Sequence, residues 1–432
     1  KKYIKFKWKK MINKFVISVC ADILKEVFIG KNPADVHLSY FFKKNRNLGS
    51  HDRSHIAEMF YGVIRNKRYL EEVVQDENPK KMILVYLMVM LGKSVRELTP
   101  ILNDREVEWL KDKKSNKQKI DNWPVKLSLP DWLWDRFIKQ YSEKELIELA
   151  QSLLVPAQLN LRVNTLKDKS RDEVINELKE SFPEHESLIL PTMHSPLGIS
   201  LPRGTSINKH SLFLSGNIEV QDEGSQILSF LLCPGRGHMV ADFCAGAGGK
   251  SLAISSIMKN TGRVYAFDIS ERRLANLKQR LKRSGGSNIM MQRIANENDL
   301  KIKRLKGKFD RVLVDAPCTG LGTLRRNPDL KWRQTQKSLS ELVVKQGEIL
   351  SSASALCKKG GYLVYATCSL LNDENEMIVE EFLSKHKGFV VISAKAALER
   401  YGIKLECDNF LKLYPNVHST DGFFGALLER ID

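Results

Sequence analysis

Apolar residues recur at helical spacing through the first part of the chain. In residues 14–28, four apolar side chains fall near one face of a helix: Phe15, Val19, Ile23 and Val27. Residues 51–74 repeat this spacing, with little that is typical of strands. The charged run KDKKSNKQK at 111–119 interrupts the periodicity and prolines follow it, which indicates a linker. The pattern therefore predicts an all-helical domain with its linker over residues 1–125.

The pattern changes over residues 126–213. Helical stretches precede a short strand-like run, QLNLRVN at 158–164, and another helical stretch follows at 171–182. The remaining residues form short runs that are separated by proline and glycine. We interpret this segment as a small α+β module.

From residue 214 to residue 432, strand-like and helical patterns alternate. Four short β-rich runs are each followed by a loop and a helical pattern: HMVADF (238–243), GRVYAF (262–267), FDRVLV (309–314) and GYLVYA (361–366). Such alternation predicts an α/β domain, with a mostly parallel sheet covered by helices on both faces. In these sheets ligands bind beyond the carboxyl ends of the strands, so the residues directly after each run are candidates for a site.

A glycine-rich loop follows the first of these runs. It consists of Cys244, Ala245, Gly246, Ala247, Gly248, Gly249 and Lys250. Glycines allow a tight turn and a close approach to a ligand, and Asp268, after the second run, can bind a pair of ribose hydroxyls.

Three ligands compete with a purely structural turn at this loop. A phosphate-binding loop would need glycine where Cys244 stands, and a dinucleotide loop would need a third glycine that is missing. A nucleoside without pyrophosphate, such as S-adenosylmethionine, needs only the turn and the acid. The residues favour this third ligand.

Two cysteines lie directly after two other runs. Cys318 stands in Asp315-Ala316-Pro317-Cys318, and Cys368 stands in Thr367-Cys368-Ser369. A structural cysteine more often lies in the middle of a strand or on the apolar face of a helix. Two thiols at the ligand-binding edge, one of them three residues after a carboxylate, favour a catalytic role.

Thiols at this edge suit the methylation of a pyrimidine ring. Carbon 5 of cytosine is a poor nucleophile toward a methyl sulfonium, and addition of a thiolate to carbon 6 divides the reaction into easier steps. A group that bonds ring nitrogen 3 would draw electron density from carbon 6, and Asp315 is the candidate. A second thiol could assist product release. The spacing alone does not settle which cysteine attacks.

Five motifs resemble the Nop/Sun family of RNA cytosine-5 methyltransferases, in particular its bacterial 16S rRNA members. They are QDEGSQ (221–226), CAGAGGK (244–250), DAPCTGLGTLRRNPDLKW (315–332), YATCS (365–369) and HSTDGFFGALLER (418–430). The resemblance covers essentially the whole chain, and residues 49–70 look like the NusB-like helical domain of that family. It implies a Rossmann-like class I methyltransferase domain that uses S-adenosylmethionine.

The resemblance also implies a role for each matching residue. Cys368 would be the nucleophile and Cys318 would aid product release, the reverse of the arrangement in DNA cytosine methyltransferases. Residues 244–250 would line the methyl donor, and Asp268 would hold its ribose. Asp315 would lie between the donor and the base.

In two places the chain departs from the family pattern. The family usually has an Ala-Pro pair inside the glycine loop, where this chain has Gly246-Ala247. It usually also has an aspartate beside the adenine, after the third strand. Here we choose Asn296 for that position, with Asp299 nearby, because an amide can still bond adenine.

Charge and cysteine usage agree with an RNA-binding enzyme. The chain has 69 Lys and Arg against 51 Asp and Glu, a formal charge of +18, which favours a polyanionic partner. Seven cysteines without a C-x-x-C pair predict neither a disulfide framework nor a metal site. No apolar run reaches the ~18 residues of a membrane span, and the start lacks the features of a signal peptide. We expect a cytoplasmic monomer that binds RNA, 16S rRNA by the resemblance, without metal or membrane.

Three basic stretches are candidates for RNA contact. Residues 1–10 combine lysines with aromatic rings, although a solvated terminus is the simpler interpretation. The loop 323–333 follows Cys318 closely, and four of its residues are expected to contact RNA: Arg325, Arg326, Lys331 and Arg333. Six basic residues lie on a helix after Asp268, and we interpret them as a solvated face: Arg272, Arg273, Lys278, Arg280, Lys282 and Arg283.

Four rival functions remain open. They are a methyltransferase for another RNA such as tRNA, a non-enzymatic RNA-binding protein on a methyltransferase fold, a P-loop ATPase and a DNA cytosine methyltransferase. The two cysteines and Asp315 argue against a pure binder, and Cys244 argues against a P-loop. A DNA enzyme would use Cys318 as its nucleophile, so replacing each cysteine separately discriminates between the last rival and the RNA enzyme.

Overall fold

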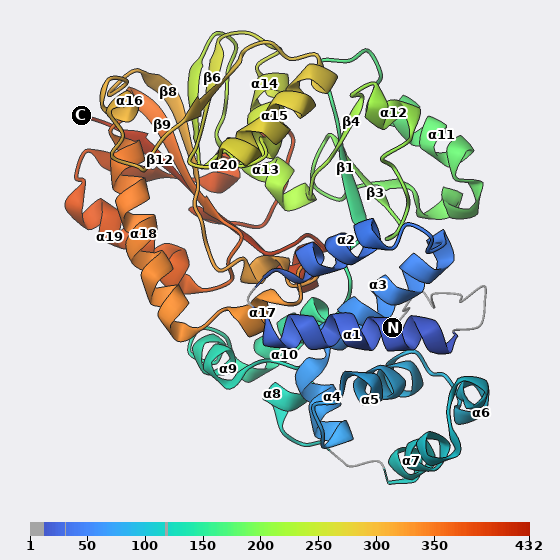
Figure 1. The fold of residues 1–432 in the computed structure, drawn as a ribbon. Coiled ribbons are helices and arrows are strands. Elements are labelled where there is room, and N and C mark those ends of the chain that lie inside the picture. Colours follow the sequence, from blue (N-terminus) through green and yellow to red (C-terminus); the bar gives the residue numbers. More distant parts are fainter. Residues whose placement is uncertain (1–12, 31, 117–119) are drawn as a thin grey trace. The chain divides into compact units, whose positions relative to one another are not determined.

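The computed structural model describes residues 13–30, 32–116 and 120–432, and Figure 1 shows it as a ribbon. The chain forms two compact units. Unit 1 contains the described residues up to Val155 together with Leu324–Thr335, and unit 2 contains Pro156–Thr323 and Gln336–Asp432. The basic stretch 1–10 lies outside the described residues. The predicted division into three domains stays a prediction.

Unit 1 is helical throughout its described residues. Its helices are α1 (Lys14–Ile29), α2 (Ala34–Lys44), α3 (Ser50–Arg65), α4 (Lys67–Val74), α5 (Pro79–Val85) with a π-helical turn at Tyr86–Met90, α6 (Val95–Leu98) with a 3-10 turn at Thr99–Ile101, α7 (Asp104–Ser115), α8 (Trp123–Lys126), α9 (Asp131–Phe137), α10 (Glu143–Leu153) and α17 (Leu330–Arg333). Capping boxes begin α7 at Asn103 and α10 at Ser142. The predicted all-helical amino-terminal region is confirmed.

Two details of unit 1 differ from the sequence prediction. Phe15 is 59% exposed, and the buried face of α1 is made by Val16, Ile17, Cys20, Ile23 and Leu24. The predicted face is therefore rotated from the real one. The predicted linker begins too early, because α7 continues through its lysines to Ser115.

The segment Leu324–Thr335 packs into unit 1, which corrects part of the predicted RNA contact. Lys331 is 3% exposed and its Nζ donates to the backbone oxygen of Arg65 at 2.8 Å. The indole of Trp332 donates to the backbone oxygen of Ile64 at 2.7 Å. Because Lys331 is enclosed by protein, the prediction that it contacts RNA is wrong. RNA contact by Arg325, Arg326 and Arg333 stays a prediction.

The first part of unit 2 is a small antiparallel sheet in the order β2-β3-β1-β4. Its strands are β1 (Leu159–Val163), β2 (Leu190–Pro191), β3 (Gly198–Leu201) and β4 (Ile218–Val220). The accompanying helices are α11 (Arg171–Ser181), a 3-10 helix at Pro183–Leu188 and α12 (Ser211–Leu214). Leu161, Val174, Leu178 and Ile199 form part of the core between them. The predicted strand near 158–164 and the helix near 171–182 are both confirmed.

The rest of unit 2 is an eight-stranded sheet in the order β10-β12-β9-β8-β5-β6-β7, with β11 beside β12. Its strands are β5 (Met239–Phe243), β6 (Arg263–Asp268), β7 (Ile289–Arg293), β8 (Phe309–Asp315), β9 (Cys357–Thr367), β10 (Phe389–Ile392), β11 (Phe410–Leu413) and β12 (Phe423–Arg430). Strands from β9 to β7 run parallel, and β12 is antiparallel to β9, β10 and β11. All four β-rich runs of the sequence became neighbouring strands.

Helices cover both faces of this sheet (Figure 1). They are α13 (Glu223–Leu231), α14 (Gly249–Ile257), α15 (Glu271–Ser284), α16 (Leu300–Lys303), a 3-10 turn at Leu321–Thr323, α18 (Gln336–Ser354), a 3-10 turn at Asn372–Glu374, α19 (Glu376–Lys385), α20 (Ala394–Glu399) and α21 (Pro415–His418). Successive strand residues point to opposite faces. In β9, Val364 belongs to the core with α13, α14 and α20, and Tyr365 belongs to the core with α18 and α19. The predicted Rossmann-like architecture is confirmed.

Candidate active site at the carboxyl ends of the strands

The glycine loop turns directly from β5 into α14. Cys244, Gly246 and Gly248 all have positive φ, at 68°, 59° and 79°. A Cβ on Gly248 would lie 2.1 Å from a methyl group of Leu277, so glycine is required there for close packing. A Cβ on Gly246 would meet only one atom within 4 Å, the backbone oxygen of Cys244, so this side of the loop has open space.

Asp268 at the end of β6 joins the loop to its neighbouring strand. It is 3% exposed, and its two carboxylate oxygens accept from the amides of Gly246 and Ser270, each at 2.7 Å. Asn296 lies in the loop after β7, where it is exposed and accepts from the amide of Asn298 at 2.9 Å. Since β6 and β7 are adjacent, the two residues predicted to bind the methyl donor, Asp268 and Asn296, lie at the same edge of the sheet.

Lys250 and Asp315 form an ion pair between α14 and β8, with 2.7 Å between Nζ and Oδ2. Burial lowers the pKa of Lys250, but the charge of Asp315 and its hydrogen bond raise the pKa more. Asp242 and Cys368 also raise this pKa, so Lys250 stays an ammonium. Both residues of this pair were predicted to belong to the site.

Asp242 at the end of β5 is a site residue that the motifs did not identify. It is fully buried, and one oxygen accepts from the hydroxyl of Ser251 at 2.5 Å. Its Oδ1 has no partner among the described residues. Burial raises the pKa of Asp242 to about 7. Its place two residues before Cys244, near the end of a strand, was the available signal.

These residues fit S-adenosylmethionine better than a phosphate ligand. Asp268 and Asp315 place two carboxylates beside the loop, which would repel a phosphate and attract a donor that carries a sulfonium and an ammonium. The turn has open space at Gly246, and Asp242 has an unpaired oxygen. The amino end of α14 closes the same loop. The carboxylates thus argue against the P-loop alternative.

The two cysteines meet at this edge. The sulfurs of Cys318 and Cys368 are 3.3 Å apart, on loops that leave the adjacent strands β8 and β9. The amide of Gly322 donates to the backbone oxygen of Cys368 at 2.8 Å, and the amide of Gly422 donates to the backbone oxygen of Gly322 at 2.8 Å. A Cβ on Gly322 would lie 2.1 Å from the oxygen of Gly422, so only glycine allows this contact. The DGFF motif therefore helps to position both thiols.

The surroundings of Cys318 favour its neutral, protonated form. Its pKa is raised well above the ordinary value, first by its hydrogen bond with Cys368, then by burial and by the charges of Cys368 and Glu374. A backbone hydrogen bond from Gly320 offsets part of this. Cys318 therefore remains a neutral thiol beside Cys368.

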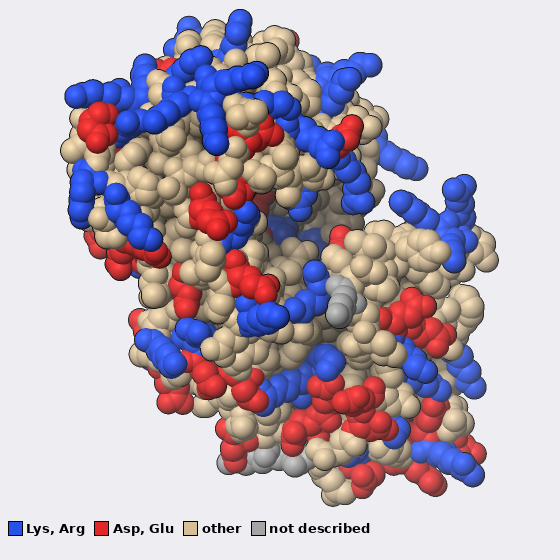
Figure 2. All heavy atoms as spheres, turned by 60° about the vertical axis from the view of Figure 1, so that its left-hand side comes forward, with Lys and Arg blue, Asp and Glu red and all other residues tan. Residues whose placement is uncertain are grey.

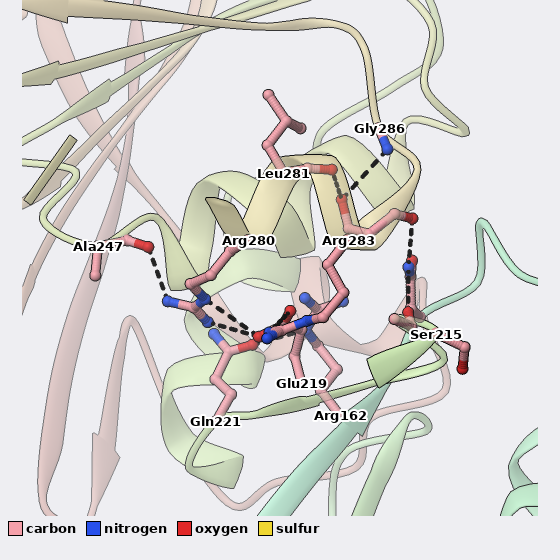
Figure 3. A network of polar contacts seen from close by, with 12 residues as sticks. Arg162, Ser215, Glu219, Gln221, Ala247, Arg280, Leu281, Arg283 and Gly286 are labelled. Carbon is pink, nitrogen blue, oxygen red and sulfur yellow. Dashed lines mark hydrogen bonds and ion pairs between the residues drawn. The ribbon is translucent and has the colours of Figure 1, made fainter. Parts of the chain in front are cut away.

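A second network, shown in Figure 3, connects the small sheet to the glycine loop. Glu219 on β4 is 2% exposed and pairs with Arg280 at 3.0 Å and with Arg283 at 2.5 Å. Arg280 also donates to the backbone oxygen of Ala247 at 2.8 Å. The interpretation of this helix as a solvated face is wrong for these two arginines, because both pair with the buried Glu219. The sequence did not indicate these pairs, since Glu219 is distant in sequence and lies outside the motifs.

Neighbouring residues extend this network inside unit 2. Arg162 on β1 is 1% exposed and donates to Gln221 Oε1 at 2.7 Å, and it comes from the LRVN run (Figure 3). The amide of Gln221 lies near Gly249, at 3.8 Å from where a Cβ would be. The small α+β module is therefore part of the support of the glycine loop.

Two further features are absent from the described residues. None of the helices combines the length and apolar composition that crossing a membrane requires. No group of three or more His, Cys, Asp and Glu side chains is arranged to hold a metal ion in the part of the chain that the structure describes.

Comparison with known proteins connects this geometry to one family. A family model described as 16S rRNA methyltransferase RsmB/F matches residues 229–429, and a model for the ferredoxin-like domain of RsmF/B-like methyltransferases matches residues 129–208. A probable ribosomal RNA small subunit methyltransferase B from Synechocystis is 29% identical, with 94% of this chain and 98% of that protein covered. Ribosomal RNA small subunit methyltransferase B from Escherichia coli is 33% identical, with 69% and 66% covered.

A solved structure agrees over nearly the whole chain. The crystal structure of PH0851 is 27% identical and has a TM-score of 0.78, with 98% of this chain and 100% of that chain covered. A methyltransferase homologue from Pyrococcus horikoshii is 28% identical with a TM-score of 0.60, over 71% and 97%. The resemblance seen in the sequence, which was strongest to RsmB (also called Sun or Fmu), is confirmed. The chain belongs to the RsmB/F family of RNA methyltransferases, enzymes that take their methyl group from S-adenosylmethionine.

Proposed function

We propose that this chain methylates carbon 5 of a cytosine in 16S rRNA, through a covalent bond between the Cys368 sulfur and carbon 6 of the ring. The observation that carries the proposal is the sulfur–sulfur distance of 3.3 Å between Cys318 and Cys368, beside the Lys250–Asp315 pair and the glycine loop. The names of the relatives from Synechocystis and Escherichia coli support a small-subunit rRNA target.

Different residues of the chain would bind the cytosine and the methyl donor. The Nζ of Lys250 donates to one oxygen of Asp315 at 2.7 Å, so the other oxygen can accept from a proton on nitrogen 3 of the cytosine or from its amino group. Residues 244–250 would line the methyl donor, Asp268 would hold its ribose and Asn296 would lie by its adenine. S-adenosylmethionine, when bound, supplies an electrophilic methyl group.

The two cysteines have different roles in the proposed reaction, Cys368 as the nucleophile and Cys318 as a hydrogen-bond donor. The Cys368 thiolate adds to carbon 6, and the electron pair of the double bond then lets carbon 5 take the methyl group. Water then takes the carbon-5 proton, the electrons of that carbon–hydrogen bond re-form the double bond between carbons 5 and 6, and the Cys368 sulfur leaves carbon 6 with the electrons of their bond. Cys318, which stays protonated at 3.3 Å, donates a hydrogen bond to the departing sulfur.

The surface suits a polyanionic substrate. Figure 2 shows lysine and arginine side chains over much of the face that unit 2 presents in that view. Contacts of such side chains with phosphates release counterions and favour binding. A cytosine must also leave its stack to reach the thiols, which is easiest in a single-stranded loop. We also propose that the chain acts as a monomer in the cytoplasm.

Methyl transfer to defined RNA tests this function. The purified chain is incubated with S-adenosylmethionine and with 16S rRNA that lacks the modification, and the digested RNA is examined by mass spectrometry for 5-methylcytidine. We expect methylation at one site, and none with Cys368→Ala. Methylation of tRNA or of DNA in place of 16S rRNA would contradict the proposed substrate, and methylation at another ring atom would contradict the proposed chemistry.

A further inference from the structure

Glu374 is a buried carboxylate that contacts both cysteine loops. It ends the 3-10 turn Asn372–Glu374 after β9, and none of its surface is exposed. The sequence motifs gave it no role, since it lies outside the YATCS motif.

Four hydrogen-bond donors converge on this carboxylate. The backbone amide of Thr319 donates at 2.8 Å and its hydroxyl at 2.5 Å. The hydroxyl of Ser369 donates to the same carboxylate, and the side-chain amide of Gln346 on α18 donates at 2.9 Å. All four donors are uncharged, so hydrogen bonds stabilise the charge of Glu374 without a cation among them.

The donors are the immediate neighbours of the two thiols. Thr319 follows Cys318 and Ser369 follows Cys368, and the hydroxyls of Thr319 and Ser369 are themselves 3.4 Å apart. The Gln346 amide also donates to the backbone oxygen of Pro317 at 2.9 Å, directly before Cys318. One carboxylate therefore connects the two loops at the point where their sulfurs meet.

Holding the loops together does not by itself require a charge. A glutamine at this position would keep an acceptor oxygen for the Thr319 amide, and the two hydroxyls can rotate to accept from its amide group. Burying a carboxylate is costly compared with burying a neutral group. The use of an acid here points to a function of its charge.

The charged groups around the thiols are distributed unequally. The charge of Glu374 disfavours ionisation of Cys318, and Cys318 and Glu374 both raise the pKa of the nearby Tyr365 on β9, after burial. On the other side, Lys250 on α14 interacts with Cys368 and is paired with Asp315 on β8. The charge of Glu374 thus acts on Cys318, and Lys250 is the cation that interacts with Cys368.

We propose that Glu374 is a positioning residue that holds the two cysteine loops together and, through its buried negative charge, keeps Cys318 as a neutral thiol beside the attacking Cys368. This inference rests on the proposed function for its catalytic meaning. Its physical content, the neutral state of the Cys318 thiol, can be measured without RNA or methyl donor.

The test is the pH dependence of alkylation of each thiol in the folded, full-length chain. Iodoacetamide reacts with thiolates, and mass spectrometry of the two peptides gives separate rates for Cys318 and Cys368. In the unchanged protein we expect Cys368 to react first and Cys318 slowly. In Glu374→Gln we expect the Cys318 rate near pH 8 to rise about tenfold, as a fall of about one unit in its pKa would give.

Two further variants separate charge from geometry. Glu376→Gln makes the same chemical change two residues away, where the carboxylate pairs with Lys412, and it should leave the ratio of the two rates unchanged. Thr319→Val removes one hydroxyl from the cluster but keeps the charge of Glu374, so it should lower thermal stability without favouring Cys318. An equal change of the ratio in Thr319→Val and Glu374→Gln would overturn the role of charge.

One variant decides the question even if Glu374→Gln does not fold. In Cys368→Ser the Cys318 thiol titrates without a neighbouring thiol but with Glu374 in place. We expect its pKa to remain above 9.0, the ordinary value for a thiol. A Cys318 that titrates at or below that value would overturn the inference. Failure of the proposed function would look different, since the alkylation pattern would hold while no RNA was methylated.

Discussion

The glycine loop and the two cysteine loops leave the same edge of one sheet, yet different chemistry fixes them. On the donor side, the cations Lys250 and Arg280 hold Asp315 and the backbone of Ala247, and Arg280 is held in turn by Glu219. On the base side, uncharged donors surround Glu374. The donor side thereby presents carboxylates to a cationic ligand, while the base side keeps one of two adjacent thiols protonated. These two environments suit the proposed methyl transfer on one side and the proposed thiol addition on the other.

Removing the attacking thiol should have the largest effect on this arrangement. Cys368→Ala is expected to lower methylation by about 10⁴-fold or more, the scale of loss seen when a nucleophile is removed. No covalent protein–RNA species should form. Rates of methyl transfer and gel electrophoresis under denaturing conditions measure both effects. Retention of the adduct in this variant would show that the thiol roles are assigned wrongly.

Removing the second thiol should separate bond formation from release. Cys318→Ala is expected to lower turnover by about 10²–10³-fold, the scale for the loss of one hydrogen-bond donor that stabilises a developing negative charge. Because addition of Cys368 is still possible, a covalent protein–RNA species should accumulate and survive denaturation. If both cysteine variants lost the adduct equally, the division of labour between the thiols would be refuted.

On the donor side, Arg280→Met should weaken the binding of the methyl donor without blocking methyl transfer. The loss of a charged hydrogen bond to Ala247 is expected to raise KM for S-adenosylmethionine about tenfold, with kcat changed much less. Arg283→Met is the matched control, since Arg283 pairs with the same Glu219 but belongs to the other end of the network (Figure 3). Equal KM values in the two variants would mean that the contact with Ala247 does not support the donor loop.

The smallest effect expected is a change in the pH dependence of stability. Burial raises the pKa of Asp242 to about 7, above the ordinary 3.8, so the unfolded chain loses this proton first. The folded state therefore loses stability as pH rises between these two values, and the loss is complete above the higher one. Asp242→Asn should remove this loss.

Thermal unfolding at several pH values measures the Asp242 effect. The difference in Tm between Asp242→Asn and the unchanged protein should move in favour of the variant by several degrees from pH 4 to pH 8. Asp408→Asn, at an exposed position, should give a constant difference over the same range. A constant difference for Asp242→Asn as well would show that the buried carboxylate does not titrate in this range.

Local patterns predicted the strands and the loops that follow them, because apolar runs and glycine turns depend on residues that are neighbours in the sequence. The parallel order then brought Cys318 and Cys368 together, because the carboxyl ends of neighbouring strands meet at one edge. The pattern placed the buried face of α1 wrongly at Phe15, because several apolar faces fit the same helix and only packing selects one. The burial of Lys331 could not be predicted for a similar reason. Its partner is a backbone oxygen from a distant part of the chain, and the sequence of the basic loop does not indicate that contact.

The supporting residues could not be predicted because their partners are distant in sequence. Glu219 lies 61 residues from Arg280, and Glu374 lies 55 residues from Thr319. No periodicity or spacing records such a pairing. Asp242 is an intermediate case, because its position before the glycine loop was visible while its burial and its unpaired oxygen required the fold.

The most direct test is to identify which cysteine becomes bonded to RNA. An RNA substrate with 5-fluorocytosine at the target site traps the adduct, because fluorine cannot leave carbon 5 as the proton does. After digestion, mass spectrometry locates the nucleotide on a peptide. We expect the nucleotide on the peptide that contains Cys368. A nucleotide on the peptide that contains Cys318 would contradict it.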